Sequence, residues 1–222
     1  MKAILIPVKN FRDSKQRLAA RFSSEERAGL AESLCEDFFR TIAQVRGATR
    51  VFVVSEEPVA LAWARENGWE TIAESGQISE SHSVDAASHY CTRKGVGALL
   101  RLPIDIPLAT PGDIESILAQ TESPPSAILV PSRDGTGTNA LLRSPPTLFP
   151  SHFGPNSFAL HLKEAEGCGA RVTSLRNPRI ELDIDEWDDL RALGPRVHAE
   201  SALARWLARH LPTGTNPSPP DG

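Results

Sequence analysis

The feature that most constrains the fold of this chain is a regular alternation of short apolar runs with segments of helical periodicity. The first run, AILIPV at 3–8, is almost continuously apolar, which is typical of a central strand with both faces covered. Similar strand-sized runs are VFVVS at 51–55, ETIAE at 70–74, ALLRL at 98–102 and AILVPS at 127–132, with ALLRS and VTSLRN further on. Strands that alternate with helices at this spacing imply right-handed crossovers. We therefore predict an α/β fold with a mostly parallel sheet covered on both faces.

The first predicted helix begins at Ser23, because Glu26 three residues further on completes a capping box. Apolar residues then recur at spacings of three or four, so we expect this long helix to lay one apolar stripe on the sheet. The stripe consists of Leu30, Leu34, Phe38, Ile42 and Val45. A second box-like arrangement, Thr110 with Pro111 and Asp113, predicts another helix start. Further helices are expected at 59–67, 83–94, 156–165 and 199–210.

The chain length, 222 residues, fits one domain with a substantial core. Hydrophobic residues make up 40% of the chain and charged residues 23%, which is ordinary for a globular protein and excludes a wholly disordered chain. We therefore predict a single domain over residues 1–210. The segment LPTGTNPSPPDG at 211–222 is rich in proline and polar residues, so we expect it to be disordered.

Charge and cysteine content exclude several classes of function. Twenty-four basic and 28 acidic residues give a formal charge of -4 with no long segment of one sign, so nucleic acid and anionic membranes are not expected partners. No apolar run reaches membrane-spanning length, and the N-terminal run is too short for a signal-peptide core, so we expect a cytoplasmic protein. Cys35, Cys91 and Cys168 lack the spacing of a zinc site or a disulfide framework.

Basic residues cluster directly after the first predicted strand. Lys9, Arg12, Lys15 and Arg17 lie within nine residues. Ligands of a doubly wound sheet bind at the carboxyl ends of its strands, so this loop is placed to meet a phosphate. A solvated surface loop explains the same residues equally well. Neither GxxxxGK[ST] nor GxGxxG follows the strand, so the common phosphate-binding loops are excluded.

Acidic residues supply two further candidates. Asp105 in LPIDIPL follows the predicted strand ALLRL, although a turn-forming bond before Pro107 is the better explanation when this residue is taken alone. Asp183 and Asp185 lie two apart in an extended segment and project to the same side, where two carboxylates repel each other unless a cation lies between them. Asp185 can instead cap a helix with Asp188 at the third position, which leaves Asp183 unexplained.

Two glycine-containing stretches complete the set. DGTGTNALL at 134–142 fits a sharp turn after a buried strand, and by itself predicts no more than a hairpin. FGPNSF at 153–158 places Gly154 where the backbone can approach a ligand closely, and Ser157 in the first turn of a helix whose free amides attract an anion. A plain loop and helix start is the alternative. Each of the four signals is weak alone, and their shared location at the carboxyl ends of strands is what predicts a site.

These stretches, read together, resemble one family. IPVKNFRDSKQRL, LPIDIPL, DGTGTNALL followed by FGPNSFALH, and ELDIDEWDDL are similar to the phospholactate and phosphoenolpyruvate guanylyltransferases of coenzyme F-420 biosynthesis, and the similarity extends to about Leu193. The resemblance implies a three-layer, Rossmann-like nucleotidyltransferase fold of the glycosyltransferase-A type with a mixed, mostly parallel sheet. It also implies an enzyme that transfers GMP from GTP to a three-carbon phospho-acid and releases pyrophosphate.

The resemblance further implies roles for individual residues. The positions that match the family's Mg²⁺-binding aspartates are Asp105, Asp183 and Asp185. The positions that match the site for the carboxylate of the acid substrate are Thr138, Gly154 and Ser157. The positions that match the basic loop around the nucleotide triphosphate are Lys9, Lys15 and Arg17. We expect these three basic residues and Asp105 to be the catalytic residues.

The chain departs from the family pattern before the third predicted helix. Many members carry a Gly-Leu-Asn turn there, whereas this chain has ESGQISESHSVDAA at 74–87, with Ser81, Ser83 and Asp85 in place of the turn. We expect this region to lie near the base or the acceptor, and we expect Ser83 to contact the nucleotide.

Several functional alternatives stay open at the level of sequence. The acceptor is 2-phospho-L-lactate, phosphoenolpyruvate or 3-phospho-D-glycerate, since a carboxylate pocket beside a phosphate suits all three. One alternative is a nucleotidyltransferase that acts on a sugar phosphate or a molybdopterin, and another is a non-catalytic nucleotide-binding regulator. The expected partners are GTP, the phospho-acid and a downstream transferase that consumes a labile product, with a homodimer as one open oligomeric state.

Overall fold

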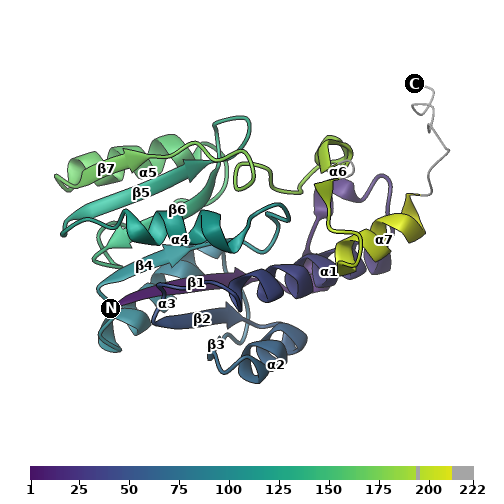
Figure 1. Cartoon of the computed structure of the whole chain (residues 1–222), viewed down its shortest axis with the longest axis horizontal. Helices are drawn as coiled ribbons and strands as arrows, with labels where there is room; N and C mark the ends of the chain where they lie inside the picture. The colour runs from purple at the N-terminus through teal and green to yellow at the C-terminus, as the bar shows by residue number, and fades with distance from the viewer. Residues whose placement is uncertain (194–195, 212–222) are drawn as a thin grey trace.

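The computed structural model describes residues 1–193 and 196–211, and its centre is a seven-stranded sheet (Figure 1). The strands lie in the order β3-β2-β1-β4-β6-β5-β7. Their bounds are β1 Lys2–Val8, β2 Arg50–Ser55, β3 Glu70–Ala73, β4 Ala98–Arg101, β5 Ser126–Pro131, β6 Thr138–Ser144 and β7 Arg171–Ser174. The helices are α1 Ser24–Ile42, α2 Pro58–Glu66, α3 Glu80–Arg93, α4 Pro111–Ala119, α5 Ser157–Gly167, α6 Trp187–Leu193 and α7 Ala202–His210, with short 3-10 helices η1 Phe11–Asp13 and η2 Gln16–Leu18.

The sheet is mixed and mostly parallel, as predicted. β1 runs parallel to β2 and β4, β2 to β3, and β5 to β7, whereas β6 is antiparallel to both of its neighbours. Only six residues separate β5 from β6, too few for a crossover connection, so the chain must reverse as a hairpin. This hairpin places the start of β6 at the same edge of the sheet as the ends of β1, β4 and β5.

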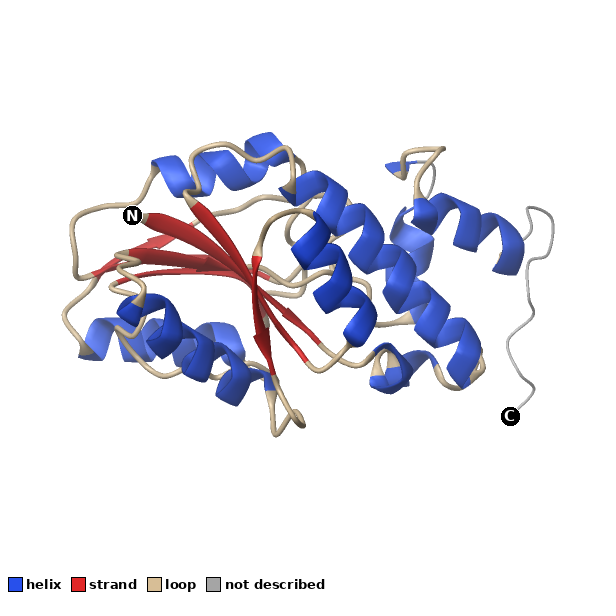
Figure 2. Ribbon diagram, turned by 90° about the horizontal axis from the view of Figure 1, so that it is seen from below, coloured by secondary structure: helices blue, strands red, loops and turns tan. Residues whose placement is uncertain are grey.

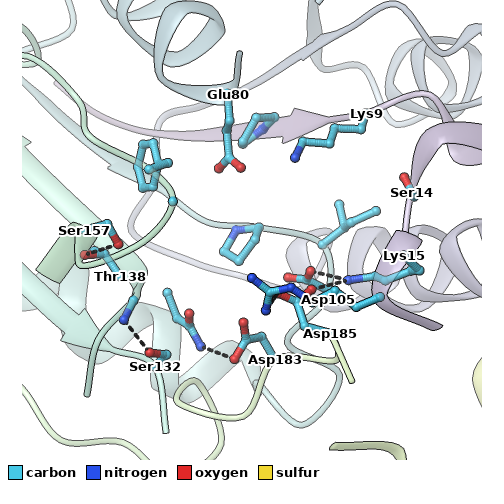
Figure 3. Close-up of a pocket in the computed structure, with 18 of the residues that line it drawn as sticks. Lys9, Ser14, Lys15, Glu80, Asp105, Ser132, Thr138, Ser157, Asp183 and Asp185 are labelled. Atoms are coloured by element: carbon cyan, nitrogen blue, oxygen red, sulfur yellow. Dashed lines mark hydrogen bonds and ion pairs between the residues drawn. The ribbon is translucent and has the colours of Figure 1, made fainter. Parts of the chain in front are cut away.

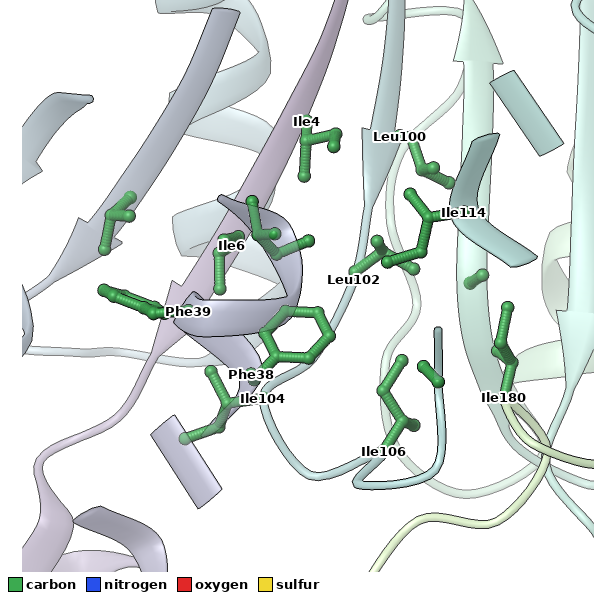
Figure 4. Packing of buried hydrophobic residues seen from close by; sticks show 14 of the residues in the cluster. Ile4, Ile6, Phe38, Phe39, Leu100, Leu102, Ile104, Ile106, Ile114 and Ile180 are labelled. Atoms are coloured by element: carbon green, nitrogen blue, oxygen red, sulfur yellow. The ribbon is translucent and has the colours of Figure 1, made fainter. Parts of the chain in front are cut away.

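Helices cover both faces of the sheet and form the predicted three layers (Figure 2). Alternate residues of β1 point to opposite faces. Ile4 and Ile6 belong to a core cluster with α1, α2 and α4, in which Phe38 and Ile114 pack over the strands (Figure 4). Leu5 faces the other way, into a cluster with α3, and β5 and β6 pack against α5 on that same side. The near-continuous apolar run of β1 is therefore explained by a strand that is buried on both faces.

The prediction that α1 lays one apolar stripe on the sheet is only half correct. The capping box of Ser23 and Glu26 is present, and Phe38 and Ile42 do pack on the sheet. Leu30 and Leu34 instead pack against α6 and α7. A helix of 19 residues is about 28 Å long, whereas a strand of 7 residues spans about 23 Å. The first turns of α1 extend past the edge of the sheet, where α7 covers them (Figure 1).

Most predicted boundaries differ from the structure by one to three residues. The helix expected at 83–94 begins earlier, at Glu80, because the Ser79 side chain accepts a hydrogen bond from the His82 amide and caps the first turn. Thr110 and Asp113 form the predicted capping box of α4. A single domain over 1–210 stays a prediction, and of the segment 211–222 that was expected to be disordered, residues 212–222 lie outside the described residues. None of the described helices is long and apolar enough to cross a lipid bilayer.

Candidate active site

A pocket of about 610 Å³ lies at the edge of the sheet where β1, β4 and β5 end and β6 begins (Figure 3). This edge adjoins the place where the chain order of the sheet reverses around β1, which is where doubly wound sheets bind their ligands. The pocket brings together nearly all of the predicted site residues. Those that line it are Lys9, Lys15, Arg17, Asp105, Thr138, Gly154, Ser157, Asp183 and Asp185.

The conformation of the basic loop after β1 is fixed by contacts with the protein core. The Phe11 side chain is buried in the core, and its backbone amide donates a hydrogen bond to the buried Glu57 carboxylate at 3.2 Å. Lys15 adopts the left-handed conformation with φ of 55°, which costs a residue with a side chain about 1 kcal/mol. The loop therefore has a fixed shape and is more than a solvated surface segment, which was the competing interpretation of its sequence.

The Lys15 ammonium points into the acidic side of the pocket. It forms ion pairs with Asp105 and, at 3.3 Å, with Asp185. Burial by itself would lower the pKa of Lys15, but the two carboxylates outweigh burial and raise the pKa above its ordinary value. Arg17 is mostly exposed and lies 3.5 Å from Asp185. Lys9 also lines the pocket and lies above Lys15, on the same side of the pocket, in the view of Figure 3. The loop thus offers one cation held by carboxylates and two more accessible ones.

Three carboxylates from distant parts of the chain meet in this pocket. The loop after β4 and the acidic segment are joined by a hydrogen bond of 2.9 Å from the Ile184 amide to the Asp105 carbonyl. Leu182 and Ile184 are buried, so Asp183 and Asp185 between and after them face the pocket, as their two-residue spacing predicted. Asp105 pairs with Lys15, which favours the site interpretation over the simple turn.

Asn139 positions the acidic segment, and sequence reasoning missed it. Its side-chain amide donates to the carbonyls of Ile180 and Glu181 at 2.9 and 3.1 Å and to the Asp183 carboxylate at 3.2 Å. Asn139 belongs to the DGTGTNALL stretch, so the hairpin reaches the acidic segment directly. An amide side chain directly before the apolar run ALL was the available signal, but its partners lie 41 to 44 residues away in the sequence.

The charges of the acidic cluster are unbalanced. Burial, followed by the negative charges of Asp105 and Asp185, raises the pKa of Asp183 to about 6. Burial would raise the pKa of Asp105 as well, but the Lys15 charge overrides it and the pKa is lowered. Asp105 therefore forms an ion pair with Lys15, whereas Asp183 forms no ion pair among the described residues.

The donor set of this cluster fits a hard divalent cation. Carboxylate oxygens are the ligands that Mg²⁺ prefers, and mutual repulsion among carboxylates is relieved by a cation. The Lys15 ammonium, which binds two of the three carboxylates, stands where positive charge is favoured. Within residues 1–193 and 196–211, no group of three His, Cys, Asp or Glu side chains already has the arrangement of a metal-binding site.

The opposite end of the pocket carries two hydroxyl groups. The Thr138 and Ser157 side chains lie at the start of β6 and of α5, and their oxygens are 3.3 Å apart. The imidazole Nδ1 of His161 lies 3.0 Å from the Thr138 hydroxyl. Gly154 has a φ of 125°, a conformation that favours glycine. The predicted acid-binding residues thus converge on one wall.

The turn of the DGTGTNALL stretch is built around Asp134. Its carboxylate accepts hydrogen bonds from the Ser132 hydroxyl at 2.6 Å and the Thr136 amide at 2.9 Å. A Cβ on Gly137 would lie 2.8 Å from the Ser132 side-chain oxygen, so any larger residue here would displace Ser132 from its bond to Asp134. Asp134 has the turn-forming role that a simple hairpin predicts, and Thr138 enters the pocket just after it.

Arg101 and Glu80 form a partly buried ion pair in the pocket, and neither was predicted. The Arg101 guanidinium donates to the Thr138 carbonyl at 3.3 Å and lies 4.1 Å from the centre of the Phe153 ring. Burial lowers the pKa of Arg101 to about 10, although Asp105 and Asp183 oppose the change. A charge inside the apolar run ALLRL was the signal that sequence reasoning passed over. We call the side of the pocket formed by Thr138 and Ser157 the hydroxyl wall. Arg101 lies between this wall and the three carboxylates.

The assignment of Ser83 to the nucleotide site is wrong. Its side chain is completely buried and donates to the Glu74 carboxylate at 2.9 Å, and it does not line the pocket. The reason is the earlier start of α3, which puts Glu80 in the first turn of the helix beside the pocket and Ser83 one turn further along, where it is buried against Glu74. The alternative interpretation of Asp185 as a helix cap is wrong. The Asp189 carboxylate accepts from the Asp185 and Glu186 amides, and the Asp185 side chain faces Lys15.

The fold of this chain is the nucleotide-diphospho-sugar transferase fold, which solved nucleotidyltransferases share. A crystal structure described as a nucleotide-diphospho-sugar transferase from Desulfovibrio desulfuricans G20 is 16% identical and has a TM-score of 0.75, and the match covers 94% of each chain. A 4-diphosphocytidyl-2C-methyl-D-erythritol synthase from Anaerococcus prevotii is 10% identical with a TM-score of 0.57, covering 92% of this chain and 95% of that one.

The family is shown by sequence. Residues 1–218 match the family model described as "Guanylyl transferase CofC like", and the chain belongs to that family. A phosphoenolpyruvate guanylyltransferase from Rubrobacter xylanophilus is 36% identical over 191 residues, which cover 85% of this chain and 91% of that protein. A 2-phospho-L-lactate guanylyltransferase from Methanothermobacter thermautotrophicus is 29% identical over 214 residues, covering 96% and 92%. The fold and the family implied by the sequence motifs are therefore confirmed.

Proposed function

We propose that this protein is a Mg²⁺-dependent guanylyltransferase that joins GMP from GTP to a three-carbon phospho-acid and releases pyrophosphate in coenzyme F-420 biosynthesis. The observation that carries the proposal is that the two ends of one pocket differ in their charged and polar side chains. Three carboxylates and a basic loop lie at one end, and a pair of hydroxyls lies at the other, with Arg101 between them. The names of the relatives, which include phosphoenolpyruvate and 2-phospho-L-lactate guanylyltransferases, support the same reaction.

The hydroxyl end suits the carboxylate of the acid. The Thr138 and Ser157 side chains line the pocket beside Gly154, and hydroxyl hydrogens are good donors to a carboxylate. An acid held there directs its phosphate toward the acidic end. Arg101 lies on that path and supplies a positive charge between the two anionic groups of the substrate.

The basic loop suits the triphosphate. Lys9, Lys15 and Arg17 line the pocket, and their charges oppose those of the phosphates. The nucleophile is the phosphate of the acid, which is already an anion and needs no general base to attack the α-phosphorus of GTP. The new bond forms between that phosphate oxygen and the α-phosphorus, and the bond to the β-phosphate oxygen breaks. Positioning and charge neutralisation therefore account for the catalysis.

Mg²⁺ would be held by Asp105, Asp183 and Asp185. When bound, it would neutralise negative charge on the reacting phosphates. The raised pKa of Asp183 fits this role, because a carboxyl surrounded by like charges gains from a nearby cation.

The reaction is tested by incubating the pure protein with GTP, Mg²⁺ and each of phosphoenolpyruvate, 2-phospho-L-lactate and 3-phospho-D-glycerate, and measuring pyrophosphate. The downstream transferase that consumes the labile product is added so that the product does not accumulate. Pyrophosphate release with at least one acid is expected. No release with any of the three acids would contradict the proposal, and release with a sugar phosphate or a molybdopterin instead would replace the acceptor.

A non-catalytic nucleotide-binding regulator is the second candidate. A regulator has no need of a cluster of mutually repelling carboxylates, and Asp183 lies in such a cluster. Turnover in the assay above excludes this candidate directly.

A further inference from the structure

His161 is buried behind the hydroxyl wall of the pocket, and the proposed reaction gives it no role. It is fully buried and lies one helical turn after Ser157 on α5, so the two side chains share a face of the helix. The Phe153 ring packs against the imidazole with ring centres 5.0 Å apart. Each ring nitrogen has one polar neighbour, the Thr138 hydroxyl on Nδ1 and the His152 backbone amide on Nε2.

The surroundings determine which nitrogen carries the proton. The His152 amide donates a hydrogen bond of 2.8 Å to Nε2, and a backbone N–H can only donate. Nε2 must therefore be without a proton. Burial, together with the nearby Arg143 and Arg101 charges, lowers the pKa of His161 to about 3, so the ring is neutral near pH 7. A neutral imidazole without a proton on Nε2 has it on Nδ1, and His161 donates to the Thr138 oxygen, 3.0 Å away.

This direction decides what the two hydroxyls can offer to a ligand. Thr138 and Ser157 have one hydrogen each, and their oxygens are 3.3 Å apart, so one hydrogen is used between them. If Nδ1 accepted a hydrogen bond, the second hydrogen would be used on the imidazole, and only lone pairs would face the pocket. Because Nδ1 donates instead, one O–H is left over and is free to point toward an acceptor in the pocket.

We propose that His161 is a positioning residue that fixes the direction of the Thr138–Ser157 hydrogen bonds, so that the hydroxyl wall presents an O–H donor to the carboxylate of the acceptor acid. The inference rests on the proposed function, since it names how the acid end of the same pocket is kept in its binding form. The other tautomer would turn lone pairs toward a carboxylate and repel it.

Three substitutions separate the two hydrogen bonds of His161. His161→Ala removes both. His161→Asn places an amide near the position of Nδ1 and restores the donor to Thr138, whereas His161→Gln places one near Nε2 and restores only the acceptor for the His152 amide. Relative to the wild type, His161→Ala and His161→Gln are expected to raise the KM for the acid about tenfold or more. His161→Asn is expected to recover most of that loss, and the KM for GTP is expected to change little in all three.

The opposite pattern overturns the inference. If His161→Gln recovers the KM for the acid and His161→Asn does not, the residue only holds the His152 backbone in place. An equal change in the KM for GTP and for the acid would also contradict it.

A measurement on the wild-type protein tests the tautomer even if the variants do not fold. Long-range 1H–15N correlation on protein with 15N-labelled histidine distinguishes the two ring nitrogens, and His161 is assigned through its contacts with the Phe153 ring. The expected result near pH 7 is a protonated Nδ1 and an unprotonated Nε2. A protonated Nε2, or an imidazolium, overturns the inference. This readout needs no turnover, so it fails separately from the proposed function, which fails if the wild type releases no pyrophosphate with any acid.

Discussion

At the scale of single residues, the acidic cluster and the hydroxyl wall depend on different kinds of neighbours. Asp183 is held by Asn139 and surrounded by like charges, whereas Thr138 is held by a neutral imidazole and a second hydroxyl. The surroundings of Asp183 favour a bound cation, and those of Thr138 favour a bound anion. Each can be disturbed by replacing one side chain without a large change in volume.

Asp183→Asn is expected to lower kcat/KM by about 100-fold or more, because it removes an anionic oxygen ligand from the proposed Mg²⁺ site. It should also reduce the strengthening of GTP binding by Mg²⁺, which calorimetry with and without Mg²⁺ measures. Asp188→Asn is the matched control, since Asp188 undergoes the same charge change but is 79% exposed and lies outside the pocket. A variant at Asp183 that keeps the full Mg²⁺ effect on GTP binding would remove this residue from the metal site.

The neutral state of His161 predicts a pH dependence of stability. The pKa is about 3 in the folded protein, whereas an unfolded histidine has a pKa of about 6.5, so the unfolded chain binds more protons between these values. Stability is therefore lost as pH falls below about 6.5, by about 2 kcal/mol between pH 7 and pH 5 for this one group. Denaturant unfolding at the two pH values should show a smaller loss in His161→Asn than in the wild type. Equal losses would indicate that His161 titrates normally.

Sequence reasoning found the residues whose chemistry is visible in their type and missed those whose role depends on a partner. Lys15 and Asp105 were expected in the site because charge follows a strand end, although their ion pair was not. Arg101 and Asn139 were missed because their partners are remote in the chain. Ser83 was misplaced because α3 starts three residues earlier than predicted, which puts Glu80 at the end of the helix beside the pocket and Ser83 one turn further into the buried part.

At the scale of elements, α1 joins two cores. Its second half packs on the sheet, and its first half packs against α7 through Leu30 and Leu34. Asp37 strengthens this junction, because its carboxylate accepts hydrogen bonds of 2.8 Å from the Ala202 and Leu203 amides at the start of α7. The carboxylate of one helix thus caps another and completes the hydrogen bonding of its first turn.

Asp37→Ala is expected to lower the free energy of unfolding by about 1–2 kcal/mol, as is usual for loss of a helix cap. Asp37→Asn keeps one acceptor oxygen and should lose less. Denaturant unfolding followed by circular dichroism measures both changes. If the two variants are equally destabilised, the charge of Asp37 matters more than its role as an acceptor, and if neither is destabilised, α7 is held by apolar packing alone.

At the scale of the whole molecule, the pocket is assembled from segments that are distant in the sequence. The loop after β1, the loop after β4, the β5–β6 hairpin and the acidic segment near residue 183 each contribute side chains. A ligand that spans the pocket therefore contacts several parts of the fold at once. Ligand binding and global stability should be coupled, because a molecule that binds only the folded state stabilises it.

GTP with Mg²⁺ at about 100 times its dissociation constant is expected to stabilise the protein by about 2.7 kcal/mol. For a chain of this size that corresponds to a rise in Tm of roughly 5–10 °C. Differential scanning fluorimetry with GTP alone, Mg²⁺ alone and both together measures it. Asp183→Asn should show a smaller rise with both ligands, and an unchanged Tm in the wild type would argue against nucleotide binding in this pocket.

The sequence by itself determined the alternation of strands and helices, the capping boxes of α1 and α4, and the membership of the charged and hydroxyl residues in one site. The strands, helices and capping boxes depend on local spacing and residue type, whereas the place of Thr138 in the site was implied by the resemblance to a family. Only the tertiary structure decided that Lys15 lies between two carboxylates, that α7 covers the first half of α1, and that His161 lies within hydrogen-bonding distance of Thr138. Each of these depends on which groups remote segments bring within hydrogen-bonding or packing distance, and local spacing carries no information about that.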